Sequence, residues 1–115
     1  MHTDGDLTAA LALGCGLGIV RVRTAAVEKG GTRSATAVYQ VEVERNGDPA
    51  LPQDVVLKHF GVSTLEPGRL YSVAARNSPR FHGAWQLCFA APAGTDDPDQ
   101  ALLRLRAKVA ALAPP

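Results

Sequence analysis

Basic and aromatic side chains gather in one stretch of the second half of the chain. The set comprises Arg69, Arg76, Arg80, Phe81, His82 and Trp85. On a small β-barrel, exposed aromatic rings stack on bases while arginines contact phosphates, and single-stranded nucleic acid is held in this way. The competing interpretation places Trp85 in the core and leaves the arginines solvated. If the stretch binds a partner, the residues predicted to contact it are Arg76, Arg80, Phe81, His82 and Trp85.

The remaining reactive side chains do not form a catalytic or metal-binding pattern. The histidines at 2, 59 and 82 lack the spacing that places two ligands on one surface. We interpret His59 as a structural or surface residue. The carboxylates at 96, 97 and 99 are explained by helix capping. We therefore expect no enzymatic activity, no metal site and no cofactor.

Cys15 and Cys88 are the only two cysteines, too few for a structural zinc site. Two interpretations remain open for them, a pair of buried thiols or one disulfide. A Cys15–Cys88 bond would join the N-terminal segment to a late strand and add about 2–4 kcal/mol of stability.

Composition indicates a single globular domain. The chain has 115 residues, of which 46% are hydrophobic and 20% charged. Its formal charge is +1, from 12 Lys and Arg against 11 Asp and Glu. There is thus no global field to recruit nucleic acid or anionic lipid. No apolar run approaches the ~18–20 residues of a membrane span, so none is expected.

A turn followed by a strand is the clearest local signal. Pro67 and Gly68 suit the two central positions of a type II turn, since proline fixes φ and glycine tolerates positive φ. From residue 69 to 76 the side chains alternate, with Tyr71, Val73 and Ala75 on one face. The pattern predicts a strand that leaves the turn at once.

The other elements follow from the same rules. Strands are predicted at 19–27, 34–45, 54–60 and 84–91, with Trp85, Leu87 and Phe89 sharing a face of the last. Glu42 and Glu44 should pair with Arg21 and Arg23 across the first two strands.

Helices are predicted near both ends of the chain. One covers 7–13; it is capped by Asp6 and ended by the glycines at 14, 16 and 18. The other follows the cap Asp97, with Pro98 at its first position. The predicted organisation is a tail with a short helix at 1–18, a β-barrel at 19–91, and a linker and helix packed on the barrel at 92–115.

Four motifs resemble the netrin-like, or tissue-inhibitor-of-metalloproteinase-like, modules of the OB fold. They are a strand at 39–45, a strand at 54–57, the element Leu65-x-x-Gly68-x-x-Tyr71, and the late cysteine Cys88. The resemblance covers residues 19–91. It implies a five-stranded Greek-key OB-like barrel with a C-terminal helix. The inhibitory members chelate a protease zinc through an N-terminal Cys-x-Cys, where this chain has Cys15-Gly16-Leu17.

A second family fits the turn region. The stretch 65–73 with Arg76 and Asn77 is similar to the tyrosine corner of fibronectin type III domains, which would give a β-sandwich. For function, we expect a non-catalytic module that binds a protein partner and is exported or associated with the cell envelope. The alternative is a single-stranded nucleic-acid-binding OB-type protein.

Overall fold

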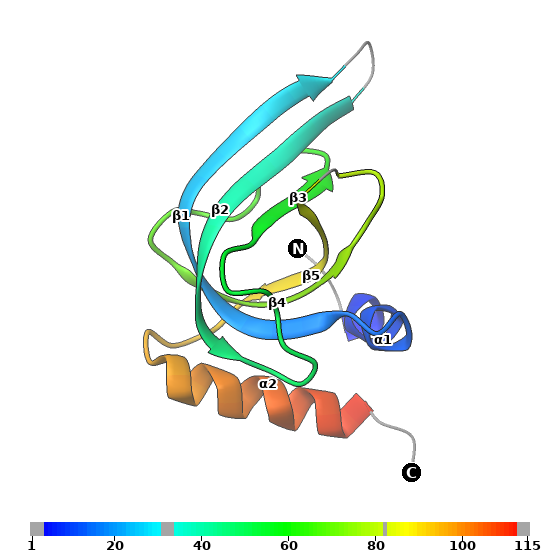
Figure 1. The fold of residues 1–115 in the computed structure, drawn as a ribbon. Helices are drawn as coiled ribbons and strands as arrows, with labels where there is room; N and C mark the ends of the chain where they lie inside the picture. The colour runs from blue at the N-terminus through cyan, green and yellow to red at the C-terminus, as the bar shows by residue number, and fades with distance from the viewer. Residues whose placement is uncertain (1–3, 31–33, 82, 113–115) are drawn as a thin grey trace.

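The computed structural model describes residues 4–30, 34–81 and 83–112 (Figure 1). The described elements, in chain order, are α1 (Asp4–Ala12), β1 (Gly16–Gly30), β2 (Ser34–Asn46), β3 (Val56–Phe60), β4 (Leu70–Asn77), β5 (Trp85–Pro92) and α2 (Pro98–Leu112). The fold is therefore mainly β, with a helix before and after the strands.

The five strands close into one ring in the order β1-β2-β3-β5-β4. Neighbouring strands are antiparallel except β3 and β5, which run parallel. This arrangement is consistent with an OB-like barrel, and it confirms the predicted fold class. The β-sandwich alternative is wrong, because the strands form one closed ring instead of two facing sheets.

The predicted turn and strand are confirmed. Gly68 has φ +85°, and the Arg69 amide donates to the Glu66 carbonyl at 3.4 Å, which closes the turn around Pro67. β4 starts at Leu70, and both of its faces are buried over its first six residues.

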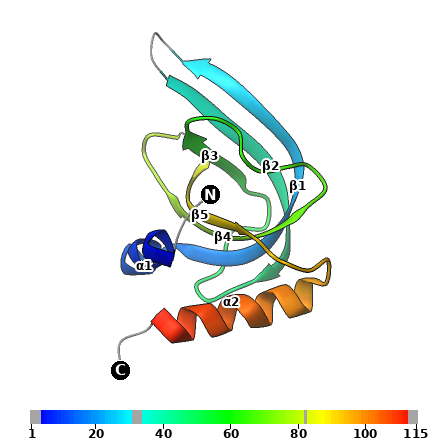
Figure 2. The same ribbon diagram turned by 180° about the vertical axis from the view of Figure 1, so that it is seen from behind.

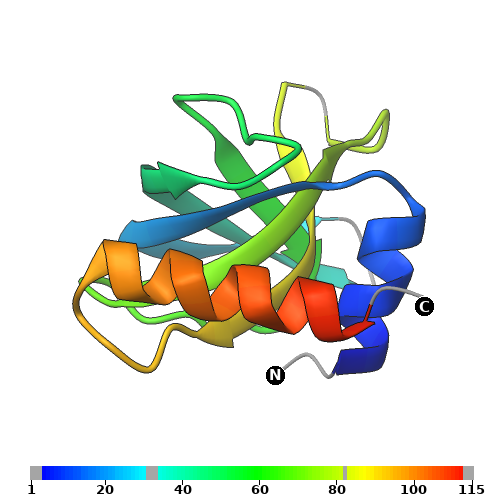
Figure 3. The same cartoon turned by 90° about the horizontal axis from the view of Figure 1, so that it is seen from below.

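β4 divides the apolar residues into an inner and an outer core. Its residues Tyr71, Val73 and Ala75 point into the ring, together with Val20, Val22, Ala37, Tyr39, Val41, Leu51, Val55, Leu57, Leu65, Leu87 and Ala90. Its residues Leu70 and Ala74 point outward and pack with Leu7, Ala10, Cys15, Leu17, Ile19, Phe89, Ala93, Ala101 and Leu105. The outer core includes residues of both helices, and Figure 3 shows α1 and α2 against the outside of the ring.

A β-bulge in β5 changes which side chains share a face. Ala75 lies opposite Leu87 and Ala74 opposite Phe89, so Cys88 is an extra residue in the ladder. Leu87 therefore enters the inner core while Phe89 joins the outer core. The prediction that Trp85, Leu87 and Phe89 share a face is wrong for Phe89, because strict alternation has no place for a bulge.

The start of β1 also differs from the prediction. The strand begins at Gly16, whereas this glycine was predicted to help end the helix of the N-terminal tail. A Cβ on Gly16 would lie 2.7 Å from the Ala50 carbonyl oxygen, and one on Gly47 would lie 2.7 Å from the Leu17 side chain. The glycines let the segment after β2 lie directly against β1.

Both helices end or begin at the predicted signals, with one exception. α1 starts at Asp4, so Asp6 lies inside the helix and is not its cap. Its C-terminus closes with bonds from Gly14 to Leu11 and from Cys15 to Ala10, with Gly14 at φ +72°. This is a Schellman motif. In α2, the Asp97 carboxylate accepts from the Asp99 amide at 3.0 Å, which confirms the cap.

Tyr39 fastens the segment after β3 to the ring. Its hydroxyl accepts hydrogen bonds from the amides of Thr64 (2.9 Å) and Leu65 (3.3 Å), and it lies 3.1 Å from His59 Nε2. His59 is thereby a structural residue, held between this hydroxyl and the Phe60 carbonyl.

Replacing Tyr39 by phenylalanine should loosen this segment selectively. The Tyr39→Phe variant leaves two amides without their acceptor, at a cost of about 1–3 kcal/mol. Amide hydrogen exchange should accelerate at Thr64 and Leu65 while residues of β4 keep their protection. Unchanged exchange at Thr64 and Leu65 would contradict this role of the hydroxyl.

Removing the cap of α2 should destabilise the protein measurably. The Asp97→Ala variant loses the acceptor for the Asp99 amide and should lower the free energy of unfolding by about 0.5–2 kcal/mol. Urea unfolding measures the change. Asp96→Ala removes a neighbouring exposed carboxylate and serves as the matched control; an equal loss in both variants would argue against capping.

Candidate functional site

The residues predicted to bind a partner lie on and around the connection between β4 and β5. The connection forms a short turn in which the amides of Arg80 and Phe81 bond to the side-chain and main-chain oxygens of Ser78. Arg80 is exposed within it. His82 lies outside the described residues.

The aromatic residues of this set face inward. Phe81 is only 6% exposed, and its ring lies 5.2 Å from that of Phe60 at the end of β3. Trp85 is half-buried and packs against the inner core. Phe81 therefore offers no free face to a base, and the ring of Trp85 is partly covered. Among the described residues of this region, the exposed aromatic is Phe60, at 51%, and Val62, two residues later, is 72% exposed. The sequence analysis did not select Phe60 or Val62 as candidate binding residues. Their position at and just after the end of a predicted strand was the one signal that could have identified them.

The arginines of the set are dispersed. Arg69 precedes β4 at the end of the strand away from Arg76, and it pairs with Glu66 at 2.7 Å. The Nε atom of Arg76 is buried and makes no hydrogen bond with the described residues. Arg69 therefore does not belong with Arg76 and Arg80 in one surface.

Many cations elsewhere on the ring are already paired. The predicted cross-strand pairs are confirmed, with Arg21 at 3.0 Å from Glu44 and Arg23 at 3.2 Å from Glu42. Further pairs join Arg45 to Asp99 and Lys58 to Glu28. The Arg45 guanidinium lowers the pKa of Asp99 through a hydrogen bond and its charge. Such exposed pairs add little stability, yet they neutralise the surface.

Cys15 and Cys88 are both free, so the disulfide interpretation is wrong. Cys15 directly precedes β1 and Cys88 lies in β5, and β4 pairs with both strands and separates them. Two strand spacings of about 4.8 Å exceed the Cα separation of about 4.4–6.8 Å that a disulfide spans.

The two thiols nevertheless interact at the level of their side chains. The pKa of Cys15 rises from 9.0 to about 12, first because burial removes the thiolate from water and then because the Cys88 thiol lies beside it. The charge of Arg76 acts in the opposite direction. Cys15 is therefore held as a protonated thiol.

Alkylation should distinguish the two cysteines. At pH 8, iodoacetamide should modify half-buried Cys88 first and Cys15 only after denaturation, as followed by mass spectrometry. Equal alkylation rates of the two cysteines in the native protein would contradict the burial argument.

The free energy of unfolding should also depend on pH through Cys15. Because the native Cys15 thiol keeps its proton to higher pH than the unfolded one, its contribution to stability should fall as pH rises from 9.0 towards about 12. The Cys15→Ala variant should lack this pH-dependent contribution.

β1 has an open backbone edge along its second half. On the side away from β2, it pairs with β4 only from Gly16 to Arg21. Val22 extends this contact by bonds to Arg69 (3.1 Å) and Gly68 (2.8 Å). Beyond it, residues 23–30 pair only with β2 within the described part of the chain. Figures 1 and 2 show this half of the hairpin extending from the ring as an arm. We call residues 23–30 the open edge.

The described residues contain no cluster of three or more His, Cys, Asp or Glu that could hold a metal ion. Among the same residues, no helix has the length and apolar character needed to cross a membrane. Comparison of the chain with protein-family models, with curated proteins and with solved structures found no match.

Proposed function

We propose that the protein is a non-catalytic protein-binding module that adds an extended segment of a partner to the open edge of β1. The observation that carries this proposal is the row of backbone groups on one edge of residues 23–30, which have no partner within the described part of the chain. An exposed edge of this kind is a template for one more strand, with main-chain hydrogen bonds giving affinity. The resemblance to netrin-like modules supports a protein partner.

The side chains of the open edge favour such pairing. Its centre, from Thr24 to Val27, is uncharged and small, so a second backbone can approach closely. Two of the flanking charges are neutralised within the fold, because Arg23 pairs with Glu42 and Glu28 with Lys58. Proteins that avoid strand addition place unpaired lysines, prolines or covering loops on such edges. Lys29 is exposed and has no ion pair with the described residues, but it lies near the far end of the open edge, outside the uncharged centre.

Nucleic-acid binding is supported less well. Of the aromatic residues that would stack on bases, Phe81 is buried and Trp85 packs on the inner core. The cations Arg21, Arg23 and Lys58 have carboxylate partners. An OB-like strand order does not by itself establish a ligand, since one fold carries many functions.

Proline substitution tests strand addition. Successive amides along a strand point to opposite edges, so of Ala25→Pro and Ala26→Pro one removes a donor from the β1–β2 ladder and the other a donor from the open edge. Extended peptides selected from a random displayed library provide the ligand. The variant that keeps its melting temperature should lose peptide binding by about tenfold or more.

Hydrogen exchange and oligonucleotide binding give two further measurements that can contradict strand addition. Bound peptide should protect amides of residues 23–30 from hydrogen exchange, and protection confined to other strands would overturn the proposed site. A single-stranded oligonucleotide serves as the comparison ligand. Retention that weakens with salt would favour the alternative function, because phosphate contacts release counterions.

A further inference from the structure

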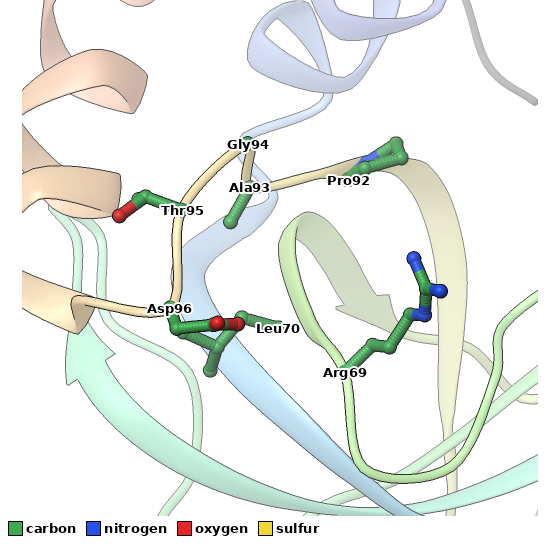
Figure 4. A pocket seen from close by; sticks show the side chains of 7 residues that line it. All are labelled: Arg69, Leu70, Pro92, Ala93, Gly94, Thr95 and Asp96. Atoms are coloured by element: carbon green, nitrogen blue, oxygen red, sulfur yellow. The ribbon is translucent and has the colours of Figure 1, made fainter.

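A groove runs between α2 and the outer face of β4 and β5, away from the open edge. It consists of two adjoining hollows of about 530 and 230 Å³ that share Pro92 and Ala93. Figure 4 shows the larger hollow, with Thr95 and Asp96 on one side and Arg69 on the other. The smaller one lies beneath Arg104, Leu105 and Lys108 of α2.

The groove exists because the strand residues beneath α2 are small. Ser72 lies opposite Ala91 in the β4–β5 ladder, and Ala93 bonds to the Leu70 carbonyl one pair further on. Ser72, Ala91 and Ala93 do not fill the space under the helix. Phe89 and Leu105 form an apolar floor and wall.

Ser72 places a polar atom in this apolar surface. Only 9% of the surface of Ser72 is exposed, and the residue lines the smaller hollow. Its hydroxyl makes no hydrogen bond within the part of the chain that the structure describes. Among the described residues the buried side-chain polar atom without a partner is Arg76 Nε, so the Ser72 hydroxyl is open to the hollow and can donate to a ligand there.

The charges of the groove favour an anion. Arg104 lines the groove and has no carboxylate partner among the described residues, whereas Arg69 is already paired with Glu66. Arg104 donates through Nη1 to the carbonyls of Gly94 (2.9 Å) and Ala93 (3.5 Å). Its Nε and Nη2 groups make no hydrogen bond with the described residues, and a guanidinium has five donors in all.

We propose that this groove binds a small amphipathic monocarboxylate. The carboxylate accepts from the Ser72 hydroxyl and from Arg104, whose planar fork matches it, while the aliphatic chain lies on Phe89, Ala91 and Leu105. A single negative charge fits better than a phosphate dianion, because Asp96 lines the same groove and Arg69 is already paired with Glu66. The proposal is independent of strand addition at the open edge.

Octanoate below its micellar concentration is the probe, and NMR titration is the measurement. Saturable shifts should appear at Ser72, Ala91 and Leu105. Acetate, which lacks the chain, and octanol, which lacks the charge, should each bind at least about tenfold more weakly, since head and chain contribute separately. Equal shifts with octanol would show a non-specific apolar surface and overturn the proposal.

Variants of exposed and buried lining residues complete the test. Arg104→Gln should weaken octanoate binding by about tenfold, as expected for a lost charge-assisted hydrogen bond. Ser72→Ala should weaken it without lowering the melting temperature. Arg106→Gln changes the same helix on the side facing Gly47 and Asp48, and it should bind as the original does. Arg104→Gln also removes the bonds to the Ala93 and Gly94 carbonyls, so its melting temperature is measured alongside. Undiminished octanoate binding by this variant would contradict the site.

Discussion

The ring depends on a very short parallel contact. β3 and β5 pair only through Leu57 with Trp85 and Lys58 with Gln86. Every other junction is a longer antiparallel ladder, so this one closes a sheet that would otherwise remain open. Closure fixes where the inner core forms, and it buries the inward-facing residues of β4. Among the described strands, the second half of β1 is the longest run that is paired along one edge only, so its other edge is available to another chain.

The helices complete what the ring leaves exposed. Leu70, Ala74 and Phe89 point away from the inner core and would face water without α1 and α2. α2 covers them incompletely, since Ser72 and Ala91 are too small to meet it. The outer core therefore stabilises the fold and also leaves a hollow. A sheet with larger residues at these two positions would bury more apolar area and have no groove.

Local signals in the sequence were sufficient for most of the fold. Pro67 with Gly68, and Asp97 with Pro98, each combine a backbone requirement with the residue that meets it, so turn and cap could be predicted. The errors arose where a contact between distant segments determines the local structure. The bulge at Cys88 shifts Phe89 to the outer core, and Gly16 serves close approach to Ala50 and not helix termination. For the site, residue types suggested exposed rings, but Phe81 is buried by Phe60, a partner that spacing could not reveal.

The pairing of Gly16 with Ala75 joins segments far apart in the chain. A contact of this span requires a long loop to be ordered before the hydrogen bonds of the ladder form, which makes folding slow compared with helical proteins of similar size. The β1–β2 hairpin can form early by itself, because its strands are adjacent in sequence. It must then wait for β4, with one edge unpaired over its whole length. During this interval the nascent hairpin is the part of the protein most exposed to association with other copies.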